Sequence, residues 1–417
     1  MASCRSFCFV LAMAVAPATV KSQVDVTLLK LESDPMMLYG AGITTVQFYE
    51  GDLEQGALDL KARLMEVAKL NPWIGSHLVK QPPMVAMRYD EEMFPVDDVF
   101  EINMNMKLRE DMPYNEMTKA GSSVGVDTGN ALIKSGKPIF KITICPRGEN
   151  GGGFAVVVSM SHAVADGYTY YAILNMLSCD AELYAMEVKR DDSLRDSLPE
   201  QVGKEAYASM ISPGFCTICK YIGQALTAKS DPPVVRLIDK VKLAEMKVKA
   251  QKEEGAAAFI STNDIITAGF ARAVKASEIT MAMDFRGRAP GLTKKHAGCY
   301  HMGIVFNAET CESPNHIRNA LNGEAPYSRP AVKKCCGGGN EFAIVSNWSS
   351  MSSKTGLTIK GCSLVLHMPF STVEPIDTCV VFTAKPGEVG VMCFLQCGTP
   401  ESLMRELPLG EAIGVAK

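Results

Sequence analysis

The sequence has no excess of charge of either sign. Lysine and arginine number 42, against 46 for aspartate and glutamate, so the formal net charge is −4 over 417 residues. A protein that holds DNA or RNA needs a basic surface, because the phosphates dominate the affinity. We therefore expect no nucleic acid partner. With 47% hydrophobic and 21% charged residues, the composition also excludes a disordered or collagen-like chain.

Long hydrophobic runs are also absent. Crossing a bilayer takes about 20 successive apolar residues, and no stretch reaches that length, so we expect no integral membrane association. Near the start, Arg5 precedes an apolar run over 7–16, and Ala14, Ala16 and Ala18 have the spacing of a signal-peptidase site. Residues 1–22 are therefore either a leader or a disordered tail. We expect a cytoplasmic protein, or one in the secretory pathway if 1–18 is a cleaved signal peptide.

The sequence lacks the motifs of nucleotide and metal sites. It contains neither a Walker loop nor a GxGxxG fingerprint. Cys216 and Cys219 form one CxxC without a matching second pair, and most of the 14 cysteines are expected to be buried thiols. His296 and His301, five residues apart, are more typical of an exposed loop than of metal ligands. We expect no metal and no bound cofactor.

Strand and helix patterns alternate along both halves of the chain. Strands are predicted at 24–31, 42–48, 139–145, 154–160, 279–284, 303–307, 342–346, 357–367, 378–383 and 390–394, and helices at 53–67, from 168 onward, at 237–254 and at 265–274. This alternation favours two α/β domains with mixed sheets. The stretch 196–235 mixes glycine, proline and polar residues and predicts a crossover linker between domains at 23–195 and 236–417.

The motif with the clearest chemistry is SHAVADG over 161–167. It follows a wholly apolar strand pattern, so His162, Asp166 and Gly167 are expected at the exit of a central, buried strand. A neutral imidazole accepts protons near pH 7, and a glycine lets a substrate approach the backbone closely. The motif alone is also compatible with a core histidine that has a hydrogen-bonding neighbour.

Three further motifs follow at characteristic distances: STND at 261–264, DFRGR at 284–288 and SNW at 346–348. Together with HxxxDG, they make the chain, from about 24 to 394, resemble the CoA-dependent acyltransferase superfamily, closest in pattern to the BAHD and trichothecene acyltransferases. The resemblance implies two similar chloramphenicol acetyltransferase-like domains, each a two-layer α+β sandwich, with an active-site channel between them. STND is expected to cap a helix rather than to take part in catalysis.

The resemblance also implies a role for each motif residue. His162 would take the proton of an attacking hydroxyl or amine, and Asp166 would point away from the channel and pair with Arg286, or failing that with Arg288. Ser346 and Trp348 match the pair that stabilises the oxyanion, although ordinary strand packing would explain them equally well. Lys294 and Lys295, which follow DFRGR, either contact the CoA phosphates or belong to a solvated loop.

The chain departs from the family pattern in two places. Ser161 stands where condensation domains have a second histidine, which disfavours a carrier-bound substrate, and the BAHD DFGWG segment is replaced by residues 358–363. We expect a monomeric acyltransferase that moves an acyl group from acyl-CoA to a small-molecule alcohol or amine in a ternary complex. Two alternatives stay open: a non-catalytic binding protein on the same fold, and a condensation-type enzyme that uses carrier-protein thioesters.

Overall fold

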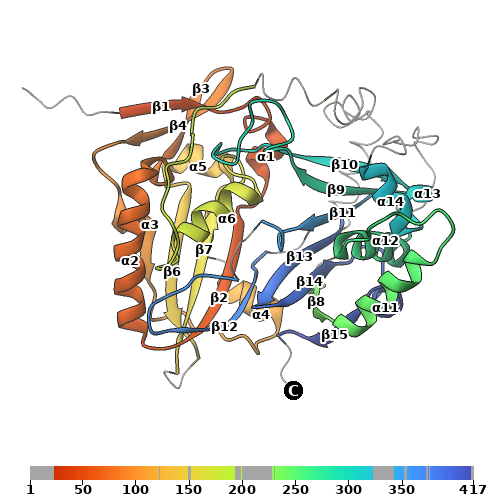
Figure 1. Cartoon of the computed structure of the whole chain (residues 1–417). Coiled ribbons are helices and arrows are strands. Elements are labelled where there is room, and N and C mark those ends of the chain that lie inside the picture. Colours follow the sequence, from red (N-terminus) through yellow and green to blue (C-terminus); the bar gives the residue numbers. More distant parts are fainter. Residues whose placement is uncertain are drawn as a thin grey trace, which may run out of the picture.

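The computed structural model describes residues 23–121, 123–148, 152–192, 228–229, 231–322, 342–351, 355–371 and 376–414, together with 199 and 374. The predicted leader, the CxxC at Cys216 and Cys219 and nearly all of the predicted linker lie outside these residues. Two large sheets lie side by side, one built mainly from each half of the chain (Figure 1). A sheet of three strands, β1 (Gln23–Thr27), β4 (Met84–Asp90) and β3 (His77–Gln81), completes the N-terminal half.

The N-terminal sheet is centred on β7 (Phe154–Met160), in which all seven residues are buried. Its order is β12 (Ser363–Pro369), β2 (Ile43–Glu50), β7, β6 (Phe140–Pro146) and β5 (Phe100–Ile102). Both neighbours of β7 run antiparallel to it. The apolar run FAVVVSM fits this place because a central strand has side chains packed on both faces.

Helices cover the outer face of this sheet. The main one, α2 (Leu53–Leu70), begins where the Asp52 carboxylate accepts a hydrogen bond from the Gln55 backbone, and it buries one face that includes Leu60 and Leu64. The shorter helices of this half are α1 (Pro35–Tyr39), η1 (Pro72–Gly75), α3 (Val96–Val99), α4 (Tyr114–Ala120) and α5 (Gly129–Ser135). Of these, α4 packs into the core between the two sheets. The helix that matters for the site is α6 (Gly167–Met176), which follows β7.

The C-terminal sheet has seven strands and is mixed. Its order is β10 (His301–Asn307), β9 (Glu278–Asp284), β11 (Phe342–Asn347), β13 (Asp377–Lys385), β14 (Glu388–Phe394), β8 (Val234–Ile238) and β15 (Leu409–Ala412). Only β11 runs parallel to its neighbours, β9 and β13. The helices of this half are α11 (Lys240–Gln251), α12 (Thr262–Val274), α13 (Ala308–Cys311), α14 (Pro314–Leu321) and α15 (Pro400–Glu406).

The two sheets are not independent. Strand β12 comes from the C-terminal half but pairs antiparallel with β2 of the N-terminal sheet, beside which it runs in Figure 1. A shared core lies between the sheets, where Phe48 and Val157 of one cluster with Phe382 and Met392 of the other. The predicted division into 23–195 and 236–417 stays a prediction, but the second segment supplies a strand to the first sheet.

Most of the predicted elements are confirmed, with two corrections. Residues 234–238 form strand β8, and Asp239 caps the helix behind it, so the helix predicted at 237–254 begins at Lys240. The strand predicted at 357–367 begins only at Ser363. The STND segment caps a helix as expected: Ser261 and Asp264 form a capping box at the start of α12.

Candidate active site

The loop that carries His162 is fixed at both ends by the chain's own hydrogen bonds. Ser161 donates from its backbone to Ile139 at 2.8 Å, just past the end of β7. At the other end the Asp166 carboxylate caps α6 by accepting the Thr169 amide at 2.9 Å. An aspartate at this position satisfies one of the amides that a helix start leaves unpaired. The polar residues of SHAVADG therefore turn the chain from a buried strand into a helix.

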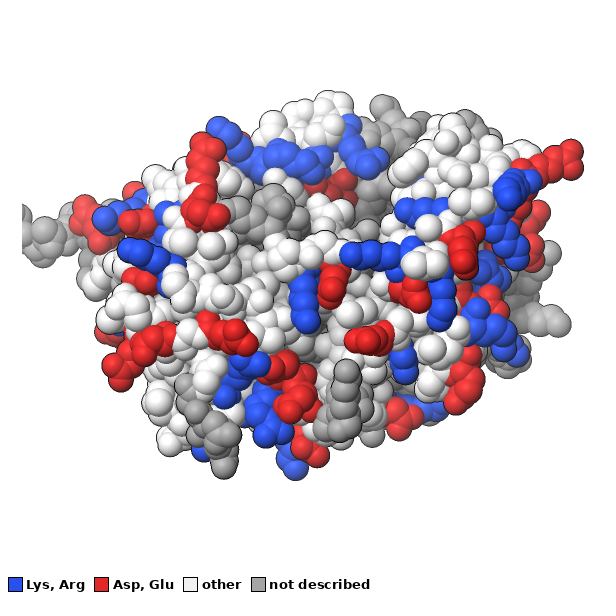
Figure 2. All heavy atoms as spheres, turned by 60° about the horizontal axis from the view of Figure 1, so that its bottom comes forward, with Lys and Arg blue, Asp and Glu red and all other residues white. Residues whose placement is uncertain are grey.

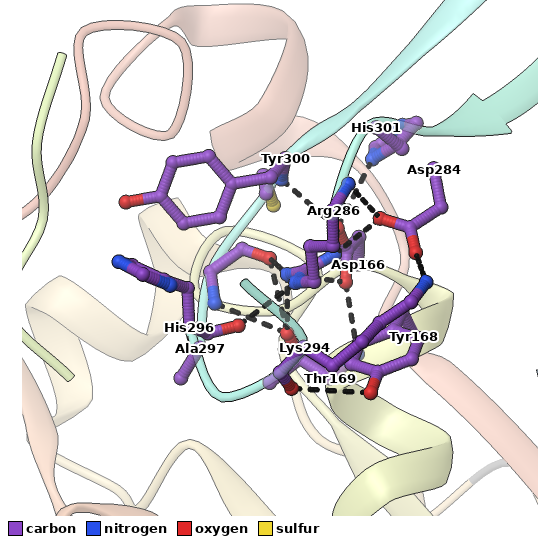
Figure 3. A network of polar contacts seen from close by, with 12 residues as sticks. Asp166, Tyr168, Thr169, Asp284, Arg286, Lys294, His296, Ala297, Tyr300 and His301 are labelled. Atoms are coloured by element: carbon purple, nitrogen blue, oxygen red, sulfur yellow. Dashed lines mark hydrogen bonds and ion pairs between the residues drawn. The ribbon is translucent and has the colours of Figure 1, made fainter. Parts of the chain in front are cut away.

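Asp166 and Arg286 form a buried ion pair (Figure 3). The carboxylate oxygens lie 2.7 Å and 3.2 Å from the two terminal guanidinium nitrogens, and both side chains are at most 1% exposed. The pair joins residues 120 positions apart, from the exit of β7 and from the loop after β9. The structure thus places Arg286, rather than Arg288, against the motif aspartate.

Every donor of Arg286 is directed to an acceptor. Its remaining contacts are with Asp284 Oδ1 at 2.9 Å, the carbonyl oxygens of His296 at 2.8 Å and Gly298 at 2.7 Å, and Thr169 Oγ1 at 3.0 Å. A buried ion pair of this kind adds little net stability over an apolar contact, but the loss of one partner leaves a buried charge uncompensated. The network therefore fixes the geometry of the His162 loop.

The environment of Asp166 decides its charge. Burial raises the pKa of this carboxyl. The charges of Arg286 and His301 and several hydrogen bonds lower it by more than burial raises it, so the pKa falls to about 2. Asp166 is consequently an anion at neutral pH and does not carry protons. His162 is the other side chain of the motif whose chemistry allows it to accept a proton.

The His162 ring is only partly engaged by the protein. Its backbone carbonyl accepts a hydrogen bond from the Cys299 thiol at 3.2 Å. The ring lies against that of His301, with centroids 5.6 Å apart and planes inclined by 37°. Within the described part of the chain, His162 Nδ1 is buried and has no hydrogen-bond partner. The histidine is therefore not saturated by internal hydrogen bonds. A non-catalytic binding protein would be expected to have a saturated histidine here.

A second buried ion pair, which the sequence analysis did not predict, also contacts the His162 loop. Arg190 Nε lies 3.1 Å from Glu32 Oε2, with side-chain exposures of 2% and 0%. Arg190 also donates to the Val164 carbonyl in the motif at 2.7 Å, and Glu32 accepts the Cys299 amide at 2.8 Å. Both residues occur in charged or polar stretches that resemble surface loops, so no sequence signal identifies them.

Gly167 allows the two halves of the chain to meet closely. A Cβ at this position would lie 2.6 Å from the sulfur of Met351, which follows the SNW motif. Met351 and Tyr168 line two neighbouring cavities, one of about 490 Å³ on the N-terminal side and one of about 370 Å³ beside α12 and β9. Gly167 therefore lies next to the residues that separate the two cavities, Tyr168 and Met351.

Ser346 and Trp348 contact each other at the end of β11. The indole nitrogen donates to the serine hydroxyl oxygen at 3.0 Å, and the indole ring packs against Tyr171 of α6 with centroids 6.1 Å apart. Trp348 also packs against both the N-terminal core and the core shared by the sheets. The pair is therefore tied to the helix that begins at Gly167.

The two predicted lysines differ in their surroundings. Lys294 Nζ lies 2.7 Å from Asp284 and 4.6 Å from the centre of the Tyr168 ring, and it lines the cavity of about 370 Å³ together with Arg288 and Arg318. Lys295 is not among the residues of that cavity wall; its backbone carbonyl accepts the amide of Glu187. Only Lys294 is connected to the ion-pair network in Figure 3.

The described residues contain neither a metal-binding cluster nor a membrane-spanning helix. No three histidine, cysteine or acidic side chains among the described residues gather in a way that would hold a metal ion. In the same part of the chain, no helix combines the length and apolarity needed to cross a bilayer. The face shown in Figure 2 carries basic and acidic side chains interspersed, in keeping with the small net charge.

Solved structures with the same fold cover nearly the whole chain, although no protein-family model and no curated protein matches it. TRI101 of F. graminearum, bound to coenzyme A and T-2 mycotoxin, is 14% identical over 92% of this chain and 96% of that one, with a TM-score of 0.55. Vinorine synthase is 13% identical over 95% and 94%, with a TM-score of 0.54. The first condensation domain of the calcium-dependent antibiotic synthetase is 14% identical over 92% and 93%, with a TM-score of 0.55.

These neighbours share one fold, with mixed sheets and helices arranged as described above. At this level of identity the likeness concerns the fold alone. The protein therefore has the chloramphenicol acetyltransferase-like fold.

Proposed function

We propose that the protein transfers an acyl group from acyl-CoA to a hydroxyl or amine of a small molecule, with His162 as the general base. One observation carries the proposal: Arg286 binds both oxygens of Asp166, while the His162 ring keeps a nitrogen without a protein partner. The motif therefore separates an anion that is held by Arg286 from an imidazole that the described protein groups do not saturate, and general base catalysis needs such an imidazole.

The reaction needs no acyl-enzyme. The acceptor oxygen or nitrogen attacks the thioester carbonyl carbon while His162 takes its proton, which gives a tetrahedral intermediate with a negatively charged oxygen. When the carbon–sulfur bond breaks, the electron pair leaves with sulfur and the imidazolium returns the proton to the thiolate. The products are the ester or amide and free CoA.

Ser346 is the proposed donor to the oxyanion. Its oxygen accepts from the Trp348 indole at 3.0 Å, so its own hydrogen stays available for donation. Removing a single oxyanion donor in other enzymes costs about 3 kcal/mol of transition-state stabilisation. Trp348 then acts by orienting Ser346 rather than by touching the reacting atoms.

The cavity of about 370 Å³ is the proposed entrance for the donor. Its wall contains the cations Arg288, Lys294 and Arg318 and two carboxylates, Asp264 and Asp284, which pair with Arg318 and Lys294. Phosphate groups bind cationic side chains of this kind. Structures of TRI101 with coenzyme A bound, and with T-2 mycotoxin or deoxynivalenol, support a CoA donor and a small-molecule acceptor on this fold. Lys295 is the weaker candidate because it is not part of the wall.

Condensation domains on the same fold keep the carrier-protein alternative open. Ser161, in place of a second histidine, disfavours it. A monomeric state and a cytoplasmic or secretory location stay predictions.

The test is release of free thiol from acyl-CoAs, acetyl to long-chain, with a pool of alcohols and amines. We expect release by the wild type and none by His162→Ala, with His316→Gln as a matched control because His316 lies exposed on α14. Equal release by His162→Ala would overturn the mechanism. No release by the wild type, and no rise in melting temperature with CoA, would favour a carrier-dependent enzyme or a binding protein.

A further inference from the structure

Three consecutive residues, 299–301, lie against the His162 loop. The Cys299 thiol donates to the His162 carbonyl at 3.2 Å, and the Tyr300 amide donates to Asp166 Oδ2 at 2.9 Å. His301 follows as the first residue of β10 and is the register partner of Asp284 on β9. These contacts fix the backbone on both sides of His301, so the fold determines where its ring lies.

The His301 ring lies between an imidazole and a carboxylate. Its centroid is 5.6 Å from that of His162, and its Nδ1 is 3.9 Å from Asp166 Oδ2. The His301 side chain is 27% exposed, whereas that of Asp166 is 1% exposed. A proton from solvent can therefore reach His301, and the resulting cation would lie beside a buried anion.

Charged groups of both signs lie around His301 in the part of the chain that the structure describes. Asp284 of β9 is the cross-strand neighbour of His301. It is bound by Arg286 at 2.9 Å and by Lys294 at 2.7 Å. Arg286 also binds Asp166. These two carboxylates and two cations together carry no net charge. Figure 3 shows His301 at the edge of this network, on the side of Asp284.

We propose that His301 is a positioning residue for His162: it takes up a proton first and, as a cation beside Asp166, keeps the adjacent His162 ring neutral and able to act as a base. Two unit charges at this separation repel each other even in water, so one imidazole of the pair must charge before the other. The carboxylate at 3.9 Å selects His301. The catalytic consequence rests on the proposed function, but the coupling of the two rings does not.

The coupling is tested by an NMR titration of the full chain labelled with ¹³C at the histidine ring, each signal being assigned by its loss on substitution. The chain has six histidines, so the spectrum is simple. In the wild type we expect His301 to titrate at higher pH than His162. In His301→Phe, which keeps a ring but loses the charge, the His162 titration should move to higher pH. In His301→Lys, which keeps a cation but loses the ring, it should not.

Unchanged titration of His162 in the phenylalanine variant, with an upward shift in the lysine variant, would assign His301 to ring packing and overturn the proposal. If the phenylalanine variant does not fold, the wild type decides, because titration of His162 at the higher pH would also overturn it. These outcomes require no turnover.

The kinetic readout connects the coupling to catalysis. Between pH 8 and pH 6, kcat/KM of His301→Phe should fall by up to about threefold more than that of the wild type, the effect of two unit charges at this distance in water. Identical profiles would overturn the proposal and leave the acyltransferase function standing. A wild type without activity would refute the function, and the NMR titration would then decide the coupling alone.

Discussion

Trp348 donates a hydrogen bond to Ser346 at the end of β11 and packs its ring against helix α6. The indole N–H lies 3.0 Å from the serine oxygen, and the same ring packs against Tyr171, in the helix that starts immediately after Asp166. The contact between Trp348 and Tyr171 therefore joins the SNW segment to the helix that Asp166 caps.

Replacing Ser346 by alanine should lower kcat of acyl transfer by about 100-fold or more, because the proposed oxyanion donor is lost. Trp348→Phe, which keeps an aromatic ring but no N–H, should cost less, since Ser346 can still donate. Steady-state kinetics with melting temperatures would check both. A wild-type kcat in Ser346→Ala would assign the serine to strand packing.

Removing one partner of the Asp166–Arg286 pair should strongly destabilise the protein. We expect Arg286→Ala to lower the free energy of unfolding by about 3–5 kcal/mol, because the Asp166 charge would be left buried without its counterion. Urea unfolding measures the loss. Lys137→Ala is the control, since its ion pair with Asp127 is 66% and 45% exposed and should contribute about 1 kcal/mol at most. Equal stability of both variants would contradict the structural role of the pair.

Gly167→Ala should be destabilising through a single contact. The added methyl would lie 2.6 Å from the Met351 sulfur. Because this sulfur lies near the end of a flexible side chain, the loss should be at the lower end of the about 1–3 kcal/mol that overpacking costs. The double variant with Met351→Ala removes the obstacle and should recover most of the loss, as a double-mutant cycle would measure. Additive effects would show that Gly167 is needed for another reason.

His367 should make the protein acid-sensitive. This buried ring has Nδ1 2.8 Å from the Thr383 carbonyl and Nε2 3.4 Å from the Tyr171 hydroxyl, and burial lowers its pKa to about 4. Because the unfolded chain takes up the proton near pH 6.5 and the folded chain only near pH 4, stability should fall as pH drops through this window. The loss would reach about 3 kcal/mol at most.

Urea unfolding at pH 7 and pH 5 would measure this loss. His367→Gln should be less stable at pH 7 because the contacts to Tyr171 and Thr383 change, but it should lose less on acidification than the wild type. The same loss in both proteins would place the acid sensitivity elsewhere.

The sequence predicted the central parts of the site because local pattern determines them. The short run 154–160, rich in valine, favours a buried strand, and an aspartate followed by a helical pattern is typical of a cap. The position of His162 at a strand exit followed from these two patterns. The choice of Arg286 came from the family resemblance, since no local rule relates residues 120 positions apart.

What the sequence could not reveal depends on distant contacts. Glu32 and Arg190 are 158 positions apart and each has polar neighbours, so their complete burial is visible only in the folded chain. His301 was interpreted as a loop histidine because its spacing to His296 says nothing about the ring of His162. Strand β12 has an ordinary strand pattern, which does not state which sheet it joins.

The placement of β12 affects how the chain can be divided. Until residues 363–369 are made, β2 has only one neighbour in its sheet, and its free edge offers unpaired amides and carbonyls to any passing strand. A ribosome-bound N-terminal half would therefore be prone to aggregate, and a fragment cut at the predicted linker would lack one side of its own sheet. The N-terminal sheet is therefore completed only after residues 363–369 have been synthesised.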